Sequence, residues 1–271
     1  LDRTSTIRVE GDDRIQFLQG QLTQDINLIS QDKALYAGFC NPKGRVLAFM
    51  LCYATQNSIY IQLESSIKES ILKKLKMYVL RSKVSLNLLE EIFTSIGFLG
   101  SNVLFELDIQ APKNYLDIVQ YHDIMIMRIG KNSERYQLIG ETSKVNEFIK
   151  LNFSAYSTMS LDDWNNLNIL DGIPDIYPTT QEAFIPQSLN MDLIEGINFK
   201  KGCYTGQEIV ARTHYLGKVK RRMYRAFIKS QVHLNPGDQI LNKNGEDIGQ
   251  LVRSAKENND KTNLLIELRV D

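Results

Sequence analysis

The chain has 271 residues, which is enough to bury a sizeable core and to form two or three domains. Hydrophobic residues make up 43% of it and charged residues 24%, and 32 Lys and Arg residues balance 32 Asp and Glu residues. The neutral balance gives no general argument for nucleic-acid or membrane binding, so such a site must be a local patch. No apolar run reaches the length of a membrane span.

The first 151 residues alternate between strand-like and helix-like patterns. A helix is expected after Gly11, carrying Ile15, Phe17, Leu18 and Leu22, and a second, amphipathic helix is expected over Ser65–Leu80. The sequence Asn41–Gly44 has the composition of a turn between two strands. The strands are expected over Thr4–Val9, Ala34–Cys40, Arg45–Ala54, Ser58–Leu63, Val84–Leu89, Ile92–Leu99, Ile118–Tyr121 and Ile124–Ile129.

Residues 218–271 have strand character throughout. The expected strands are Met223–Ile228, Gln239–Leu241, Ile248–Ser254 and Leu264–Val270, with a hairpin turn at Asn244-Gly245. The pattern as a whole predicts an α+β fold with a small C-terminal β-barrel-like module at 218–271. The region 1–217 is predicted to hold two interleaved subdomains, the middle one at about 89–156.

The cysteines and histidines exclude several kinds of site. Three widely spaced cysteines, Cys40, Cys52 and Cys203, form no disulfide framework and no CxxC pair, which fits a reducing cytoplasm. The N-terminal residues show no signal-peptide hydrophobic region. The histidines, His122, His214 and His233, form no close metal-ligand pair, so no metal site is predicted. The chain contains no G-x-G-x-x-G and no P-loop.

The segment KGCYTGQE, residues 201–208, is the most informative motif. Thr205 and Glu208 have the spacing of a capping box, which predicts a helix that begins at Thr205. The positive end of that helix, with Lys200 and Lys201, would favour thiolate over thiol at Cys203. The alternative is a buried cysteine that packs as a small hydrophobe. His214 would lie about three helical turns away, which disfavours a Cys–His catalytic pair.

The chain resembles the YgfZ family, folate-binding proteins related in fold to the glycine-cleavage T-protein. The most specific match is FKKGCYTGQEIVAR, residues 199–212. Supporting matches are QFLQGQLTQDI at 16–26, NPKGRVL at 41–47, LKMYVLRSKV at 75–84 and FIPQSLNMD at 184–192. The resemblance implies a cloverleaf of three parts around a central hole that binds tetrahydrofolate. It also implies a role in iron–sulfur cluster assembly or repair, and through it in tRNA modification.

The resemblance also assigns residues. Cys203 and Lys201 would carry the chemistry, with Gly202 and Tyr204 beside them. Trp164 would stack on the pterin ring, although the only tryptophan could equally anchor its helix to the core. Gln187 and Asp171 are further candidate folate contacts.

Two positions depart from the family pattern. The T-protein relatives often carry a glutamate that reads the pterin's amino edge where this chain has Leu170, so Asp171 would have to replace it. Some relatives have a second folate-contacting tryptophan where this chain has about Thr4. Both departures weaken the expectation of folate binding.

Three functions are compatible with these residues. The first is a folate-binding accessory protein of iron–sulfur assembly with a reactive Cys203. The second is a T-protein-like aminomethyltransferase or demethylase, for which Asp171 and Asp192 are candidate acid–base groups. The third is a non-catalytic module in which the basic stretch 218–225 binds tRNA or a protein; solvated surface charges are the simpler interpretation of that stretch.

Overall fold

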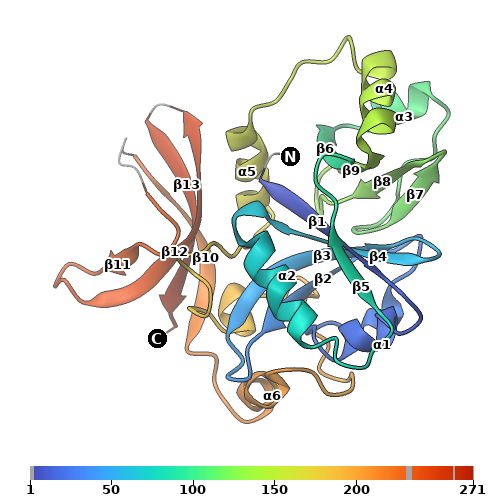
Figure 1. Ribbon diagram of the computed structural model, residues 1–271. Coiled ribbons are helices and arrows are strands. Elements are labelled where there is room, and N and C mark those ends of the chain that lie inside the picture. The colour runs from blue at the N-terminus through green and yellow to red at the C-terminus, as the bar shows by residue number, and fades with distance from the viewer. Residues whose placement is uncertain (1–2, 230–233, 259, 271) are drawn as a thin grey trace.

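The computed structural model describes residues 3–229, 234–258 and 260–270, and His233 lies outside them. The described residues form three antiparallel sheets with separate helices (Figure 1), which confirms the predicted α+β class. None of their helices is long and apolar enough to cross a membrane.

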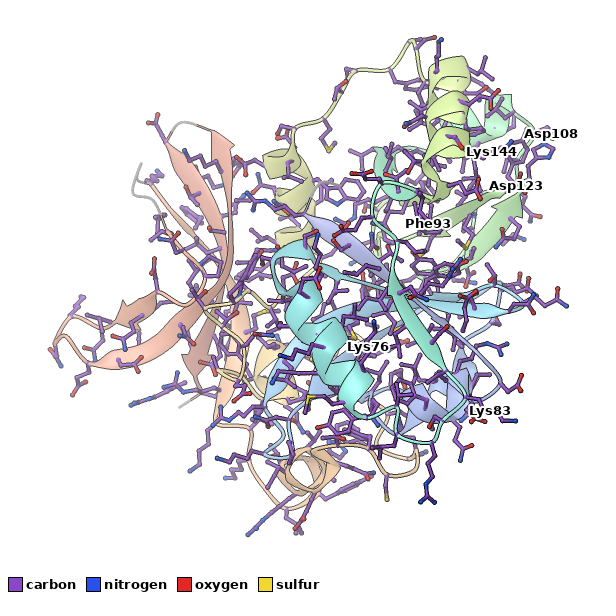
Figure 2. The ribbon with its side chains drawn as sticks, viewed as in Figure 1. Lys76, Lys83, Phe93, Asp108, Asp123 and Lys144 are labelled. Atoms are coloured by element: carbon purple, nitrogen blue, oxygen red, sulfur yellow. The ribbon has the colours of Figure 1, made fainter. Side chains whose placement is uncertain are left out.

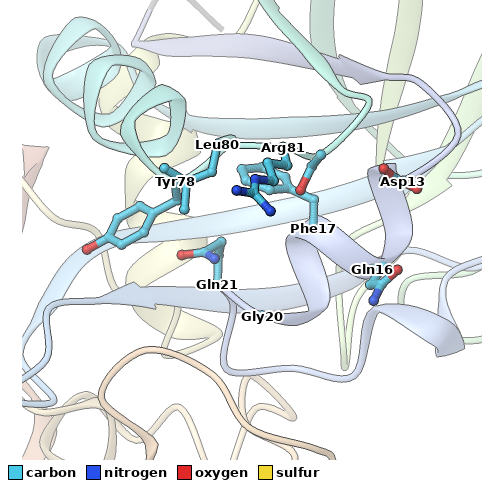
Figure 3. A pocket seen from close by; sticks show the side chains of 9 residues that line it. Asp13, Gln16, Phe17, Gly20, Gln21, Tyr78, Leu80 and Arg81 are labelled. Carbon is cyan, nitrogen blue, oxygen red and sulfur yellow. The ribbon is translucent and has the colours of Figure 1, made fainter.

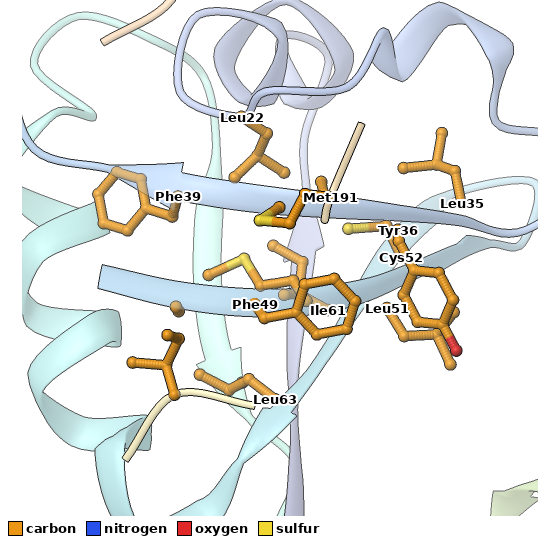
Figure 4. Close-up of a cluster of buried hydrophobic side chains, with 14 of the residues drawn as sticks. Leu22, Leu35, Tyr36, Phe39, Phe49, Leu51, Cys52, Ile61, Leu63 and Met191 are labelled. Atoms are coloured by element: carbon orange, nitrogen blue, oxygen red, sulfur yellow. The ribbon is translucent and has the colours of Figure 1, made fainter. Parts of the chain in front are cut away.

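The first sheet has the order β2-β3-β4-β1-β5. Every residue of β3 is buried, because α2 and the irregular segments 176–197 cover the faces of the sheet, so its nine-residue apolar run lies inside the main core (Figure 4). The elements are β1 (Thr4–Glu10), α1 (Arg14–Gln19), β2 (Leu35–Cys40), β3 (Val46–Ala54), β4 (Ser58–Glu64), α2 (Lys68–Met77) and β5 (Ser85–Leu88).

The predicted helices of this part are shorter than their apolar patterns. The helix α1 ends at Gln19, so Leu22 reaches the core from the following loop, where it forms a bridge with Phe39. In α2, Ile71, Leu72 and Leu75 face the core while the lysines face outward. The periodicity therefore identified the buried face correctly but not the helix ends.

The second sheet has the order β6-β9-β8-β7 and its own hydrophobic core. A stack of aromatic rings joins it to the first sheet: the centroids of Tyr60 and Phe93 lie 5.1 Å apart, and their planes differ by 3° (Figure 2 labels Phe93). The elements are β6 (Phe93–Leu99), α3 (Asn102–Glu106), β7 (Ile118–Tyr121), β8 (Ile124–Arg128), β9 (Arg135–Glu141) and α4 (Thr142–Asn152).

The third sheet has the order β10-β13-β12-β11 and packs against α5. Among the described residues it is an open four-stranded sheet, so the C-terminal β module forms as predicted but is not closed into a barrel. The expected turn lies at Gly245, whose φ is 79°. The elements are α5 (Leu161–Leu170), α6 (Gln207–Tyr215), β10 (Arg221–Ile228), β11 (Gln239–Leu241), β12 (Asp247–Asn258) and β13 (Lys261–Arg269). The domain boundary between residues 217 and 218 stays a prediction.

Candidate functional site

A cavity of about 80 Å³ lies where the three sheets meet. Its wall includes Thr4 of β1, Tyr36 of β2, Gln137 of β9, Trp164 of α5 and Arg253 of β12. This is the place in the fold where a central hole is expected from the family resemblance. At roughly 30 Å³ per water molecule, the cavity has room for two or three waters.

Trp164 is buried at the edge of this cavity, with 6% of its surface exposed. Its ring lies directly against the backbone of β6, because a Cβ atom added to Gly97 would come within 2.2 Å of it. The Arg135 guanidinium lies over the ring, 5.2 Å from its centroid. Trp164 therefore anchors α5 and lines the cavity at the same time, so the two interpretations of this residue are compatible.

Two fully or nearly buried arginines flank the cavity. Arg135 has no exposed side-chain surface and forms an ion pair with Asp171, with 2.8 Å between Nη2 and Oδ2. Arg253 donates from Nη2 to Asp175 Oδ2 over 2.6 Å. Burial raises the pKa of Asp175 to about 6 against the opposing effect of Arg253. Both buried arginines are thus paired with a carboxylate, as burial of a charge requires.

Gln137 supplies the polar group of the cavity that lacks a partner. The residue is 4% exposed, and its Oε1 accepts no hydrogen bond from any described residue. A buried amide oxygen without a donor costs about 1–3 kcal/mol, which a ligand or water N–H or O–H group would offset. Its position in the wall makes it the acceptor that the cavity offers to a ligand.

Two stacked aromatic rings of the first sheet also line the cavity. Tyr36 and Phe49 are stacked with their centroids 4.9 Å apart, and both belong to the cavity wall. Thr4 also lies in the wall and accepts a hydrogen bond from Gln62. The aromatic surface that the threonine lacks is therefore present in the cavity on other strands.

Lys201 lies inside the protein rather than beside the solvent. Its ammonium donates to the carbonyl oxygens of Gln19, Leu22 and Gln24 at 2.7, 2.6 and 2.9 Å. It also lies 5.1 Å from the centroid of the Tyr204 ring. Burial lowers its pKa to about 8. All three ammonium protons are used, so Lys201 fastens its own loop to the loop 19–24 and has no proton left to donate to the Cys203 thiolate.

The predicted capping box at Thr205 is wrong. The helix α6 begins at Gln207, and its N-cap is Gly206 in the left-handed conformation with φ of 85° and no side-chain cap. The Thr205 hydroxyl lies 3.4 Å from Gln21 Oε1 instead. A glycine that can adopt positive φ therefore sets the helix start, and the threonine joins the same contact with the loop 19–24 that Lys201 makes.

Cys203 is the exposed cysteine of this chain, whereas Cys40 and Cys52 are fully buried. Burial raises the pKa of each of these two thiols to about 12. Beside Cys203, Gly202 has open space where a Cβ would stand, and Tyr204 is buried. The residues that line the central cavity do not include any of positions 201–204. The structure thus separates the cysteine loop from the Trp164 cavity.

Other predicted site residues serve the fold. Gln187 is fully buried and donates from Nε2 to the Val210 carbonyl of α6 over 2.7 Å, outside the cavity wall. His214 stacks flat on Phe199, with 3.7 Å between ring centroids. Among the described residues, no group of three or more His, Cys, Asp and Glu side chains is placed to hold a metal ion.

The arginines of the basic stretch 218–225 are also engaged in contacts within the chain. Arg221 pairs with Glu267. Arg222 makes two hydrogen bonds to the Asp192 carboxylate, at 2.6 and 2.9 Å. Arg225 donates to the Leu170 carbonyl. These arginines hold β10 to the rest of the chain, which weakens the case for RNA binding by this stretch.

The sequence analysis missed Arg135, Gln137 and Arg253. All three lie in strands, each is buried, and each has an apolar residue on at least one side. A charged or amide residue at an inward strand position is a signal that could have identified them, since such positions are normally apolar.

Curated proteins of similar sequence include members of the YgfZ family. The tRNA-modifying protein YgfZ of Colwellia psychrerythraea is 33% identical over 227 residues, which cover 83% of this chain and 69% of that protein. The YgfZ protein of Blochmanniella pennsylvanica is 31% identical over 271 residues, covering 94% and 82%. No protein-family model matches the chain.

The solved structure of glycine cleavage system aminomethyltransferase T from Bartonella henselae superposes with a TM-score of 0.74. It covers 98% of this chain and 76% of that protein at 13% identity. The likeness shows that this chain has the T-protein fold, as the sequence motifs predicted.

Proposed function

Because this chain belongs to the family of the tRNA-modifying protein YgfZ, we propose that it is a tetrahydrofolate-binding accessory protein of iron–sulfur cluster assembly or repair. Through that role it would support tRNA modification. The central cavity would bind the folate, and Cys203 would act as an exposed thiol toward a partner protein.

The observation that carries the folate proposal is the buried, unpartnered Oε1 of Gln137 in an aromatic cavity. A pterin ring is flat and presents N–H donors along one edge, so it suits an amide acceptor between aromatic walls. Asp171 does not supply this acceptor, because it is ion-paired with Arg135 and stands outside the wall. Gln137 would therefore accept the hydrogen bonds of the pterin's amino edge, the role of the glutamate that T-protein relatives often carry at the position of Leu170.

The size of the cavity sets a condition. A space of about 80 Å³ is smaller than the roughly 300–1,000 Å³ of ordinary ligand pockets, so the walls must separate to admit a pterin ring. Glu64 also lines a neighbouring cleft of about 510 Å³, with Arg3 and Lys256 in its wall. The glutamate tail of a folate would lie in this cleft and pair with Arg3 and Lys256, on the part of the wall away from the carboxylates of Glu64 and Asp162.

The transferase alternative is less well supported by these contacts. Its candidate acid–base groups, Asp171 and Asp192, both form close ion pairs with arginines. Both carboxylates are occupied by guanidinium groups and neither lines the central cavity, so neither is placed to exchange a proton with a ligand there. Folate binding without turnover is the simpler use of this cavity.

Intrinsic fluorescence tests the folate site directly, because Trp164 is the single tryptophan of the chain. Titration with 5-formyltetrahydrofolate should change its emission and give a dissociation constant, with calorimetry as a second readout. Gln137→Leu should weaken binding about tenfold, the loss expected when one buried hydrogen bond is removed. Gln187→Leu is the matched control, since Gln187 is equally buried outside the cavity wall and also has an unpartnered Oε1.

If Gln137→Leu leaves the dissociation constant unchanged, or the wild type gives no signal, the central cavity is not the folate site. The thiol role is tested in cells that lack the protein and express a plasmid copy. Cys203→Ser should remain folded and should lose thiolation of tRNA by iron–sulfur enzymes. Full complementation by this variant would exclude a thiol role.

A further inference from the structure

The segment LKMYVLRSKV, residues 75–84, does not line the central cavity. It includes the end of α2 and carries two strongly exposed apolar side chains. Met77 is 69% exposed and Leu80 is 88% exposed. Leu80 also has a positive φ of 43°, a strained backbone conformation for a bulky residue. A strained and almost fully exposed leucine contributes little to the core, and such strain concentrates at functional sites.

Positive charge predominates around this apolar group, and the one carboxylate in the wall of the adjoining hollow, that of Asp13, accepts a hydrogen bond from the Lys83 amide. Residues 73–83 contain five cations and no carboxylate. None of the five joins an ion pair among the described residues. Figure 2 labels Lys76 on α2 and Lys83 beside α1, at the two ends of this face. Since the whole chain is neutral, this is a local excess of charge. The five cations are Lys73, Lys74, Lys76, Arg81 and Lys83.

A hollow of about 820 Å³ lies beneath the exposed leucine. Tyr78, Leu80 and Arg81 lie on one side of it, and Gly20 and Gln21 lie on the other (Figure 3). An apolar side chain of another molecule could enter this hollow and contact Leu80, which lines it. Exposed aliphatic groups with a charged rim are typical of a protein–protein contact.

The hollow adjoins the cysteine loop. The Thr205 amide donates to the Gly20 carbonyl over 3.3 Å, and its hydroxyl lies 3.4 Å from Gln21 Oε1. Lys201 is fastened to the carbonyl of Gln19 at 2.7 Å. Because the exposed Cys203 stands between these two anchored residues, a molecule bound over the hollow would have the thiol at the edge of its contact surface.

We propose that this surface, made of Met77, Tyr78, Leu80, Arg81 and the lysines at 73, 76 and 83, docks a partner protein whose contact surface carries carboxylates around an apolar centre. The inference rests on the proposed function in one respect, that the partner is the iron–sulfur protein that Cys203 serves. An RNA partner is disfavoured because the two most exposed side chains are aliphatic, whereas RNA is recognised by ring stacking and phosphate contacts. The four cations of this surface attract an acidic partner and accelerate its association at low salt.

Site-specific photo-crosslinking in cells tests the proposal. The photoreactive residue p-benzoylphenylalanine replaces Leu80 in the full chain, and Phe105 is the matched control because it is 86% exposed on α3 of the second sheet's module. The Leu80 site should give a protein adduct about tenfold stronger than the control, as expected for a specific contact. Mass spectrometry of the linked peptide should show Asp or Glu next to apolar residues.

A second variant tests the charge. The combined changes Lys73→Glu, Lys76→Glu and Arg81→Glu alter exposed and unpaired side chains, so the protein should remain folded and bind 5-formyltetrahydrofolate as the wild type does. They should reduce the Leu80 adduct about tenfold, since reversed rim charges slow association.

Four outcomes would overturn the docking surface: equal adducts at Leu80 and Phe105, an adduct removed by ribonuclease, an adduct with a second copy of this chain, or an adduct that charge reversal leaves unchanged. Failure of the wild type to bind 5-formyltetrahydrofolate would overturn the proposed function alone, because the crosslink does not depend on the folate. The two failures are therefore distinguishable.

Discussion

Replacing Lys201 by methionine separates the two roles that this residue could have. If Lys201 fastens the cysteine loop, Lys201→Met should lower the free energy of unfolding and leave the pH dependence of Cys203 alkylation unchanged. If it activates the thiolate, alkylation of the variant should require a higher pH. Methionine keeps the length and the apolar stem of lysine, so the change removes mainly the ammonium group.

The size of the effect follows from its contacts. Hydrogen bonds from a charged donor contribute about 1.5–3 kcal/mol each, and Lys201 makes three. Burial offsets part of this, because the fall in its pKa from 10.5 to about 8 corresponds to about 3 kcal/mol. The variant also leaves three carbonyls without a donor. We therefore expect a loss of about 3 kcal/mol in the free energy of unfolding.

Urea unfolding measures the stability, and iodoacetamide labelling across pH 6–10 measures the thiol. Labelling of the native protein should report Cys203 alone, because Cys40 and Cys52 are fully buried. The matched control is Lys200→Met, since Lys200 is exposed and makes only a backbone hydrogen bond to Asn198. A loss below about 0.5 kcal/mol, the range of ordinary surface changes, would refute the fastening role. An alkylation profile that is shifted to higher pH in Lys201→Met would instead support activation of the Cys203 thiolate by Lys201.

Four further substitutions test other features of the structure. Gly97→Ala should displace the Trp164 ring, lower the free energy of unfolding by about 1–3 kcal/mol and shift the tryptophan emission, because the added Cβ meets the ring at 2.2 Å. Thr205→Ala should cost less than about 0.5 kcal/mol in urea unfolding, whereas Ser160→Ala, which breaks the capping box of α5, should cost about 1 kcal/mol. The folded state holds the Asp175 proton more tightly than the unfolded state, so stability from this group is lost as pH rises from 3.8 to about 6. Relative to Asp175→Asn, the wild type should therefore lose free energy of unfolding over that range and change little from pH 6 to 8; the opposite slope would contradict the raised pKa.

The strands could be predicted from the sequence because their signals are local. Apolar runs such as Val46–Ala54 and alternating segments such as Thr4–Glu10 carry their own periodicity. The helix through Ile209–Arg212 forms as predicted, but its start at Thr205 was mispredicted for the opposite reason. A Ser/Thr-x-x-Glu spacing indicates a cap only if the threonine backbone adopts the cap conformation, and here Gly206 takes that place.

The site could be predicted only in part, because its contacts join distant segments. Lys201 is two residues from Cys203 in sequence, which suggested an electrostatic role, but its ammonium bonds to carbonyls 177 to 182 residues away. Gln137 has no sequence motif around it, and it becomes significant only because its strand faces the cavity. Spacing along a chain cannot reveal such contacts, whereas a polar residue within an apolar strand gives a weak signal of them.

The two halves of the candidate site are connected through one strand. Tyr36 of β2 lines the cavity, and two residues along the same strand Gly38 exchanges hydrogen bonds with Thr23, at 2.9 Å to its amide and 2.7 Å to its hydroxyl. Thr23 lies between Leu22 and Gln24, whose carbonyls hold Lys201. The cavity, which must widen to admit a pterin ring, therefore borders β2. In turn, β2 contacts the loop 19–24, to which Lys201 fastens the cysteine loop. Such contiguity is a route for coupling only if the strand has two arrangements that the ligand distinguishes. The proposed folate cavity and the exposed thiol of Cys203 thus lie in separate places joined by these contacts, as expected if the bound molecule and the partner protein do not share one pocket.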